Sequence, residues 1–149
     1  MPPAGPPPTE KERADVLAGF QAIIDAIEEH EQWQPPNPPP TLFHVWDFAN
    51  RAKYMVSEYE NIRDGKPLKH PDQIRPAPGT GEANAMKVFA EACGRTMMLQ
   101  LLVEDKSGKT AMLTGQSGPP LDFGPKVKEA VENQMKTVPS NYFMAGLQG

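Results

Sequence analysis

One segment of the sequence has residue types that could bind a phosphate. Residues 107–110 read Ser-Gly-Lys-Thr, which matches the end of a phosphate-binding P-loop. That motif also needs a glycine five residues before Gly108, and Val103 occupies this position. Without it the backbone N–H groups cannot wrap around a phosphate. We therefore interpret the segment as an ordinary turn and predict no bound cofactor.

The residues that could hold a metal or act as a nucleophile are few and scattered. A zinc site needs three or four converging ligands, and the chain offers His30, His44 and His70 far apart, with Asp47 one helical turn from His44. The single cysteine, Cys93, follows an apolar helical pattern, where a free cysteine is usually a small core residue. We predict no metal site, no catalytic residues and no enzymatic activity.

The charge pattern argues against nucleic acid and lipid as partners. The net charge is −4, and residues 1–80 carry 8 basic against 12 acidic side chains, whereas residues 81–149 carry 7 of each. No basic stripe is present to neutralise phosphates or anionic lipid. The longest strongly apolar run, Met97–Val103, is too short to cross a bilayer. We expect neither nucleic-acid binding nor a membrane span, although association with a membrane complex is compatible with the pattern.

The prolines divide the chain into segments. The 18 prolines fall in four clusters, at 2–8, 35–40, 67–78 and 119–139. Proline fixes φ and lacks a backbone donor, so these clusters cannot lie inside helices or sheets. We expect stiff extended connections between helical segments, with 35–40 as a polyproline II spacer.

The first half of the chain predicts two helices. Thr9 and Glu12 have the spacing of a capping box, and an apolar stripe follows, so we expect a helix from about Glu10 to Gln32. A second helix should start at Thr41 and end near residue 63, with Gly65 as its stop. Its aromatic residues lie on more than one side, which indicates contact with two surfaces.

The second half predicts two further helices and one ambiguous stretch. A helix should start near Glu82 and continue to about Val103, because Met, Leu and Gln favour helices. The alternative is a short β-hairpin near 96–114. Pro125 is well placed at the first position of a last helix that ends before Pro139.

The fold prediction is a mostly α protein with three to four helices and extended Pro-rich N- and C-terminal arms. The predicted organisation is an N-terminal arm (1–8), a single helical domain (9–138) with Pro-rich connections at 35–40 and 66–81, and a C-terminal docking arm (139–149). Aromatic residues and methionine are enriched at interfaces. The predicted partner-binding residues are Phe43, Trp46, Phe48, Tyr54, Tyr142, Phe143, Met144 and Leu147.

These features favour a non-enzymatic structural subunit of a large multiprotein assembly, whose partners are other protein subunits. An accessory subunit of an organellar complex, such as a mitochondrial energy-converting complex, is the preferred setting and a virion connector the next. One alternative is a soluble adaptor that presents polyproline ligands. Another is a small enzyme, which would need two or more of His44, Asp47, Glu91 and Cys93 within hydrogen-bond reach in a concave site. The lone cysteine and the absence of a signal pattern predict an intracellular, reducing location and no secretion.

Overall fold

The computed structural model describes residues 5–74, 78–104 and 121–148, and their regular structure is helical. The elements are α1 (Glu10–Glu28), α2 (Pro40–Ser57), α3 (Tyr59–Asp64), the short 3-10 helix η1 (Pro71–Gln73), α4 (Glu82–Glu104), α6 (Gly124–Thr137) and α7 (Ser140–Gln148). The mostly α prediction is confirmed. The described residues contain six α-helices rather than the three to four predicted.

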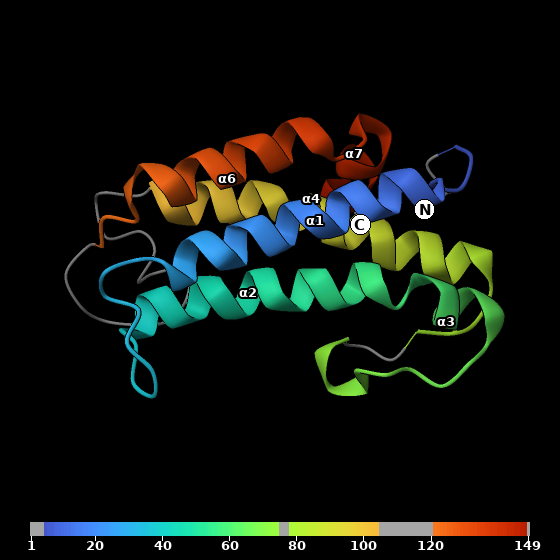
Figure 1. The fold of residues 1–149 in the computed structure, drawn as a ribbon. Helices are drawn as coiled ribbons and strands as arrows, with labels where there is room; N and C mark the ends of the chain where they lie inside the picture. The colour runs from blue at the N-terminus through green and yellow to red at the C-terminus, as the bar shows by residue number, and fades with distance from the viewer. Residues whose placement is uncertain (1–4, 75–77, 105–120, 149) are drawn as a thin grey trace.

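Four long helices form an antiparallel bundle with up-down-up-down order (Figure 1). Helix α1 packs on α2 and α6, and α4 packs on the same two helices from the other side, which closes the ring. Helices α3 and α7 pack on α4, at the end of the bundle where both chain ends lie (Figure 1). The core runs between the four long helices.

Helix α1 begins as predicted and ends earlier. The Thr9 hydroxyl accepts from the Glu12 N–H at 3.0 Å, and the Glu12 carboxylate accepts from the Thr9 N–H at 2.9 Å, which confirms the capping box. The helix ends at Glu28 instead of Gln32. Beyond Glu28 the backbone forms turns: the His30 N–H donates to the Ile27 carbonyl at 3.0 Å, and the Gln32 N–H donates to the His30 ring at 3.0 Å.

The predicted second helix is divided in two. Helix α2 begins at Pro40 and ends at Ser57, and α3 follows after Glu58. The stop at Gly65 is confirmed, since this glycine adopts a left-handed φ of 70° that other residues rarely tolerate. The connection at 35–40 is not an extended spacer, because the chain turns at residues 35–37 before it enters α2.

Helix α4 decides between the two predictions for residues 96–114. Residues 96–104 continue the helix to Glu104, so the hairpin alternative is wrong there, and residues 105–114 lie outside the described part. The continuation buries Thr96, Leu99 and Leu102, whose spacing of three residues places them on one helix face against the bundle. Helix α6 starts as predicted, with Pro125 in its first turn.

The extended C-terminal arm is a wrong prediction. Residues 140–148 form helix α7, which packs closely on α4 where Gly94 meets Gly146. The N-terminal residues also contact their own chain: Pro8 is buried, and the Pro6 carbonyl accepts a hydrogen bond from the Tyr142 hydroxyl. In the part of the chain that the structure describes, no helix combines the length and apolar character that would cross a membrane.

Candidate interaction surface

Three aromatic rings stack at the end of the bundle where α2 begins. The Trp33 and Trp46 rings lie 5.6 Å apart between centroids with an interplanar angle of 28°, and Phe43 stacks on Trp46 at 5.8 Å and 24°. We call these three residues the aromatic stack. Phe43 is 43% exposed although its ring is held in place. A rigid, exposed ring loses little entropy when a partner covers it, which is typical of an interface anchor.

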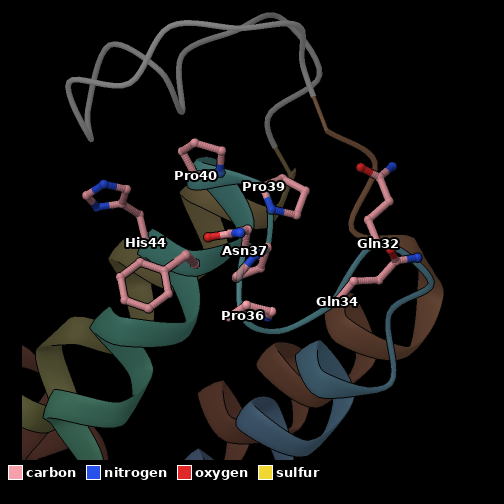
Figure 2. A pocket seen from close by; sticks show the side chains of 9 residues that line it. Gln32, Gln34, Pro36, Asn37, Pro39, Pro40 and His44 are labelled. Atoms are coloured by element: carbon pink, nitrogen blue, oxygen red, sulfur yellow. The ribbon is translucent and has the colours of Figure 1, made fainter.

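A surface hollow of about 840 Å³ opens beside the aromatic stack (Figure 2). The connection between α1 and α2 and the first turn of α2 supply its lining: Gln32, Gln34, Pro36, Asn37, Pro38, Pro39, Pro40, Phe43 and His44. Apolar proline rings alternate with amide groups that can hydrogen-bond. This chemistry suits the side chains of a protein partner.

Two other predicted aromatic residues are covered by charged or polar side chains. The Arg95 guanidinium carbon lies 4.5 Å from the centroid of the Phe48 ring, and burial lowers the pKa of that guanidinium. The Tyr54 ring lies 4.1 Å from the His70 ring, with the Lys53 ammonium 4.8 Å from its centroid. The chain thus already supplies partners for both rings.

The four predicted C-terminal residues differ in exposure: Tyr142 is buried, Phe143 is half-buried, and Met144 and Leu147 are exposed. Tyr142 is buried with its ring edge-to-face on Phe89 at 5.2 Å, and Phe143 packs partly against the core. Burial raises the pKa of Tyr142 to about 12, so its hydroxyl stays a donor at neutral pH. By contrast, Met144 is 51% and Leu147 47% exposed on α7. Met144 and Leu147 therefore offer the most apolar surface to a partner among these four residues.

The side chains considered for chemistry do not converge. Cys93 is buried, and burial raises the pKa of its thiol to about 12, which disfavours the reactive thiolate. His30 lies 2.8 Å from the Asp122 carbonyl, and Asp47 is paired with Arg51 at 3.0 Å. Within the described ranges no group of His, Cys, Asp and Glu side chains could hold a metal. The P-loop-like residues 107–110 lie outside those ranges.

A buried carboxylate holds the loop that follows α3. Glu58 is 1% exposed and accepts from the His70 N–H at 2.7 Å and from the Asn61 amide at 2.8 Å. Burial opposes ionisation of Glu58, but the hydrogen bonds from His70, Asn61 and the Lys69 N–H outweigh it and keep its pKa below the ordinary value. The ionised carboxylate thus fixes residues 69 and 70 against α3.

Sequence reasoning missed two residues of this surface. Trp33 precedes the Pro-rich connection, which folds back and brings its ring onto α2; the only available signal was a tryptophan next to a proline cluster. Leu101 is 52% exposed near the end of α4, and this end of α4 lies at the end of the bundle where α2 begins (Figure 1). Its place in an apolar run hid its exposure.

Comparison with known proteins identifies no relative of this chain. No protein-family model matches the chain, and neither a curated protein nor a solved structure matches it.

Proposed function

We propose that this protein is a structural subunit of a multiprotein assembly and docks on a neighbour through the aromatic stack. The single observation that carries the proposal is the exposed Phe43 ring, fixed on Trp46 and Trp33. A large ring that is both rigid and exposed would bury apolar area on binding without a large ordering cost. The hollow beside it offers amide groups for hydrogen bonds around the apolar contact.

The exposed part of α7 supports a second, smaller contact in the same assembly. Met144 and Leu147 lie one turn apart on this helix, and both are about half exposed. Methionine adapts its shape to a partner surface, which suits an auxiliary contact. The aromatic stack and α7 lie toward opposite ends of the bundle (Figure 1), so two neighbours could be engaged at once.

The polyproline-adaptor hypothesis has less support. A polyproline ligand is recognised as an extended helix with accessible rings. Residues 35–37 instead turn, and the Pro6 carbonyl is hydrogen-bonded to Tyr142. The assembly hypothesis needs neither segment to be extended. The organellar setting, with the virion setting after it, stays a prediction from the sequence.

The proposal is tested by sizing the tagged chain from its native source and identifying what co-migrates. We expect migration far above 16.4 kDa with stoichiometric protein partners. Phe43→Ala should return the chain to its own size, because the ring supplies the anchor. Migration of the unmodified chain as a lone monomer would contradict the proposal.

A matched control separates loss of the anchor from general damage. Phe48 has the same side chain on the same helix, but Arg95 covers its ring. Phe48→Leu keeps apolar volume there and should leave the assembly intact. If Phe43→Ala and Phe48→Leu cause the assembly to dissociate equally, the aromatic stack is not the docking site.

A further inference from the structure

A second hollow lies between α1 and α6, away from the aromatic stack. Its volume is about 340 Å³, and its lining includes the small residues Gly19, Ala22, Ala26 and Ala130. Small side chains leave room for an incoming group. On their own they would only indicate close helix packing, so the polar groups of the lining decide what could enter.

A buried amide with a free acceptor lines this hollow. Gln134 on α6 is 0% exposed, and its Nε2 donates to the Val16 carbonyl at 2.8 Å. Its Oε1 is buried and has no hydrogen-bond partner among the described residues. A buried acceptor without a donor destabilises the protein, because the acceptor has lost its hydrogen bond to water. The position therefore favours a ligand that brings an N–H.

The unpartnered oxygen lies against a residue that has no side chain. A Cβ placed on Gly19 would lie 1.6 Å from the Gln134 Oε1, so the amide oxygen occupies the space that a side chain would fill. Gly19 and Gln134 both line the hollow. The amide oxygen thus packs against the backbone of Gly19.

The charges that line the hollow are mainly negative. Asp25 and Glu29 come from α1 and Glu129 from α6, against the single cation Lys126, which gives a net charge of −2. The Lys126 ammonium lies 3.8 Å from the Glu29 carboxylate and so offsets the negative charge of Glu29. Asp25 and Glu129 remain to attract a cation.

We infer that the hollow is a docking site for an arginine side chain carried by a partner protein. The guanidinium has five N–H donors in a planar fork, enough to donate to the Gln134 Oε1 and to pair with Asp25 and Glu129. Its aliphatic stem lies over Ala22 and Ala26. Lysine offers a single point charge and fits the combination of amide and carboxylate oxygens less well.

The described arginines of this chain are already engaged in contacts of their own, which favours an arginine from another protein over one from a second copy. Arg51 is paired with Asp47, and Arg95 is held on the Phe48 ring. Arg13 and Arg63 are paired with Glu60 and Asp64. Each would have to give up its own contact to enter the hollow of a copy.

The test uses a helical alanine-based peptide with arginine at every fourth position, and a counterpart with lysine at the same positions. Binding to the full-length protein is measured by isothermal titration calorimetry at low salt. We expect the arginine peptide to bind about 10-fold more tightly than the lysine peptide. The double variant Asp25→Asn/Glu129→Gln should weaken the arginine peptide about 10-fold.

A steric variant checks the location. Ala22→Leu fills the hollow and should abolish binding, whereas Ala14→Leu, two turns away on α1 and outside the lining, should not change it. Circular dichroism confirms that each variant is folded; if Ala22→Leu is not, the charge variant decides. No binding, equal binding of both peptides, or binding that survives both the filled hollow and the charge variant would overturn the inference.

The inference rests on the proposed function, because it names a partner for a second surface, but the two fail separately. Phe43→Ala should leave peptide binding unchanged. An assembly that depends on Phe43 together with absent peptide binding would reject the α1–α6 site alone. Dimerisation of the free chain that Asp25→Asn abolishes, seen by sedimentation, would assign the hollow to a second copy and overturn the choice of partner.

Discussion

The two ends of the bundle both gather aromatic rings but treat them in opposite ways. At the end where the chain termini lie, Tyr59 and Tyr142 pack edge-to-face on Phe89, and all three are buried. Their hydroxyls are used internally: Tyr59 donates to Glu82 at 2.8 Å, and Tyr142 donates to the Pro6 carbonyl. At the other end, the aromatic stack leaves Phe43 exposed.

The difference comes from what the chain provides as cover. Pro6 contacts Tyr142, and α7 packs on α4, so these segments close the first cluster. Among the described residues nothing comparable covers Phe43. A ring that its own chain has covered contributes to stability, and a ring left open in a fixed position is available to a partner.

The largest expected effect concerns the helix contact that closes the terminal end. A Cβ on Gly146 would lie 1.9 Å from the Ala90 carbonyl oxygen, and this backbone cannot move without shifting α4. Gly146→Ala should therefore destabilise the fold by about 3 kcal/mol, although the same change usually stabilises a helix. Urea denaturation measures it.

Gly19→Ala is the matched comparison for that change. Its Cβ would meet the end of the flexible Gln134 side chain rather than backbone, so we expect a cost of about 1 kcal/mol. If Gly146→Ala is the milder of the two, the α4–α7 contact does not close this end of the molecule.

The next effect concerns Glu58, whose carboxylate holds the loop after α3. Glu58→Gln places an amide donor among the N–H groups of His70 and Asn61 and should cost about 2 kcal/mol at neutral pH. Because the folded-state pKa of Glu58 is lowered from 4.5, its contribution is present above pH 4.5 and is lost as the pH falls through the folded-state value.

Thermal melts of the unmodified chain and of Glu58→Gln as a function of pH check this sign. The gap between the two proteins should close as the solution is acidified. A gap of constant size down to the lowest pH at which the chain folds would show that ionised Glu58 does not hold the loop.

A smaller effect concerns the hydroxyl that ties the two chain ends together. Tyr142→Phe keeps the ring on Phe89 but removes the hydrogen bond to the Pro6 carbonyl, and we expect a loss of about 1 kcal/mol. Tyr54→Phe is the control with little expected effect, since Tyr54 contacts His70 through its ring, which the substitution keeps. Equal midpoints of urea denaturation for Tyr142→Phe and the unmodified protein would mean that the hydrogen bond to Pro6 does not contribute to stability.

The smallest expected effect on stability is at the open end. Phe43→Ala should change the free energy of unfolding of the isolated chain by only about 0.5 kcal/mol, because much of the ring is already in water. A loss of several kcal/mol in urea denaturation would show that Phe43 is a core residue. The comparison between the two ends would then be wrong.

The sequence was sufficient for elements with strong local signals. The capping box at Thr9, the stop at Gly65 and the start near Pro125 depend on residues that act within a few positions, and all three are present. Helix α4 was predicted through Val103 from intrinsic preference alone. Patterns of this kind need no knowledge of the tertiary fold.

What the sequence could not give depends on contacts between distant segments. Residues 139–149 were predicted as an extended docking arm because Pro139 ends the preceding helix and the tail is rich in apolar residues. Helix α7 instead gains its packing from Gly94, far away in the chain. The same limit affected the candidate site. Phe43 and Tyr142 look alike as exposed-aromatic candidates, and only the fold shows that Tyr142 is buried and Phe43 is not.

The most direct measurement places the photo-reactive residue p-benzoyl-phenylalanine at Phe43 and, in a separate protein, at the exposed Ala83 at the start of α4. Each tagged protein is irradiated in its native source. The account predicts one dominant cross-linked protein from position 43, which also co-migrates with the chain, and none from position 83. Equal cross-linking from both positions, or none from position 43 while the chain still migrates in an assembly, would contradict it.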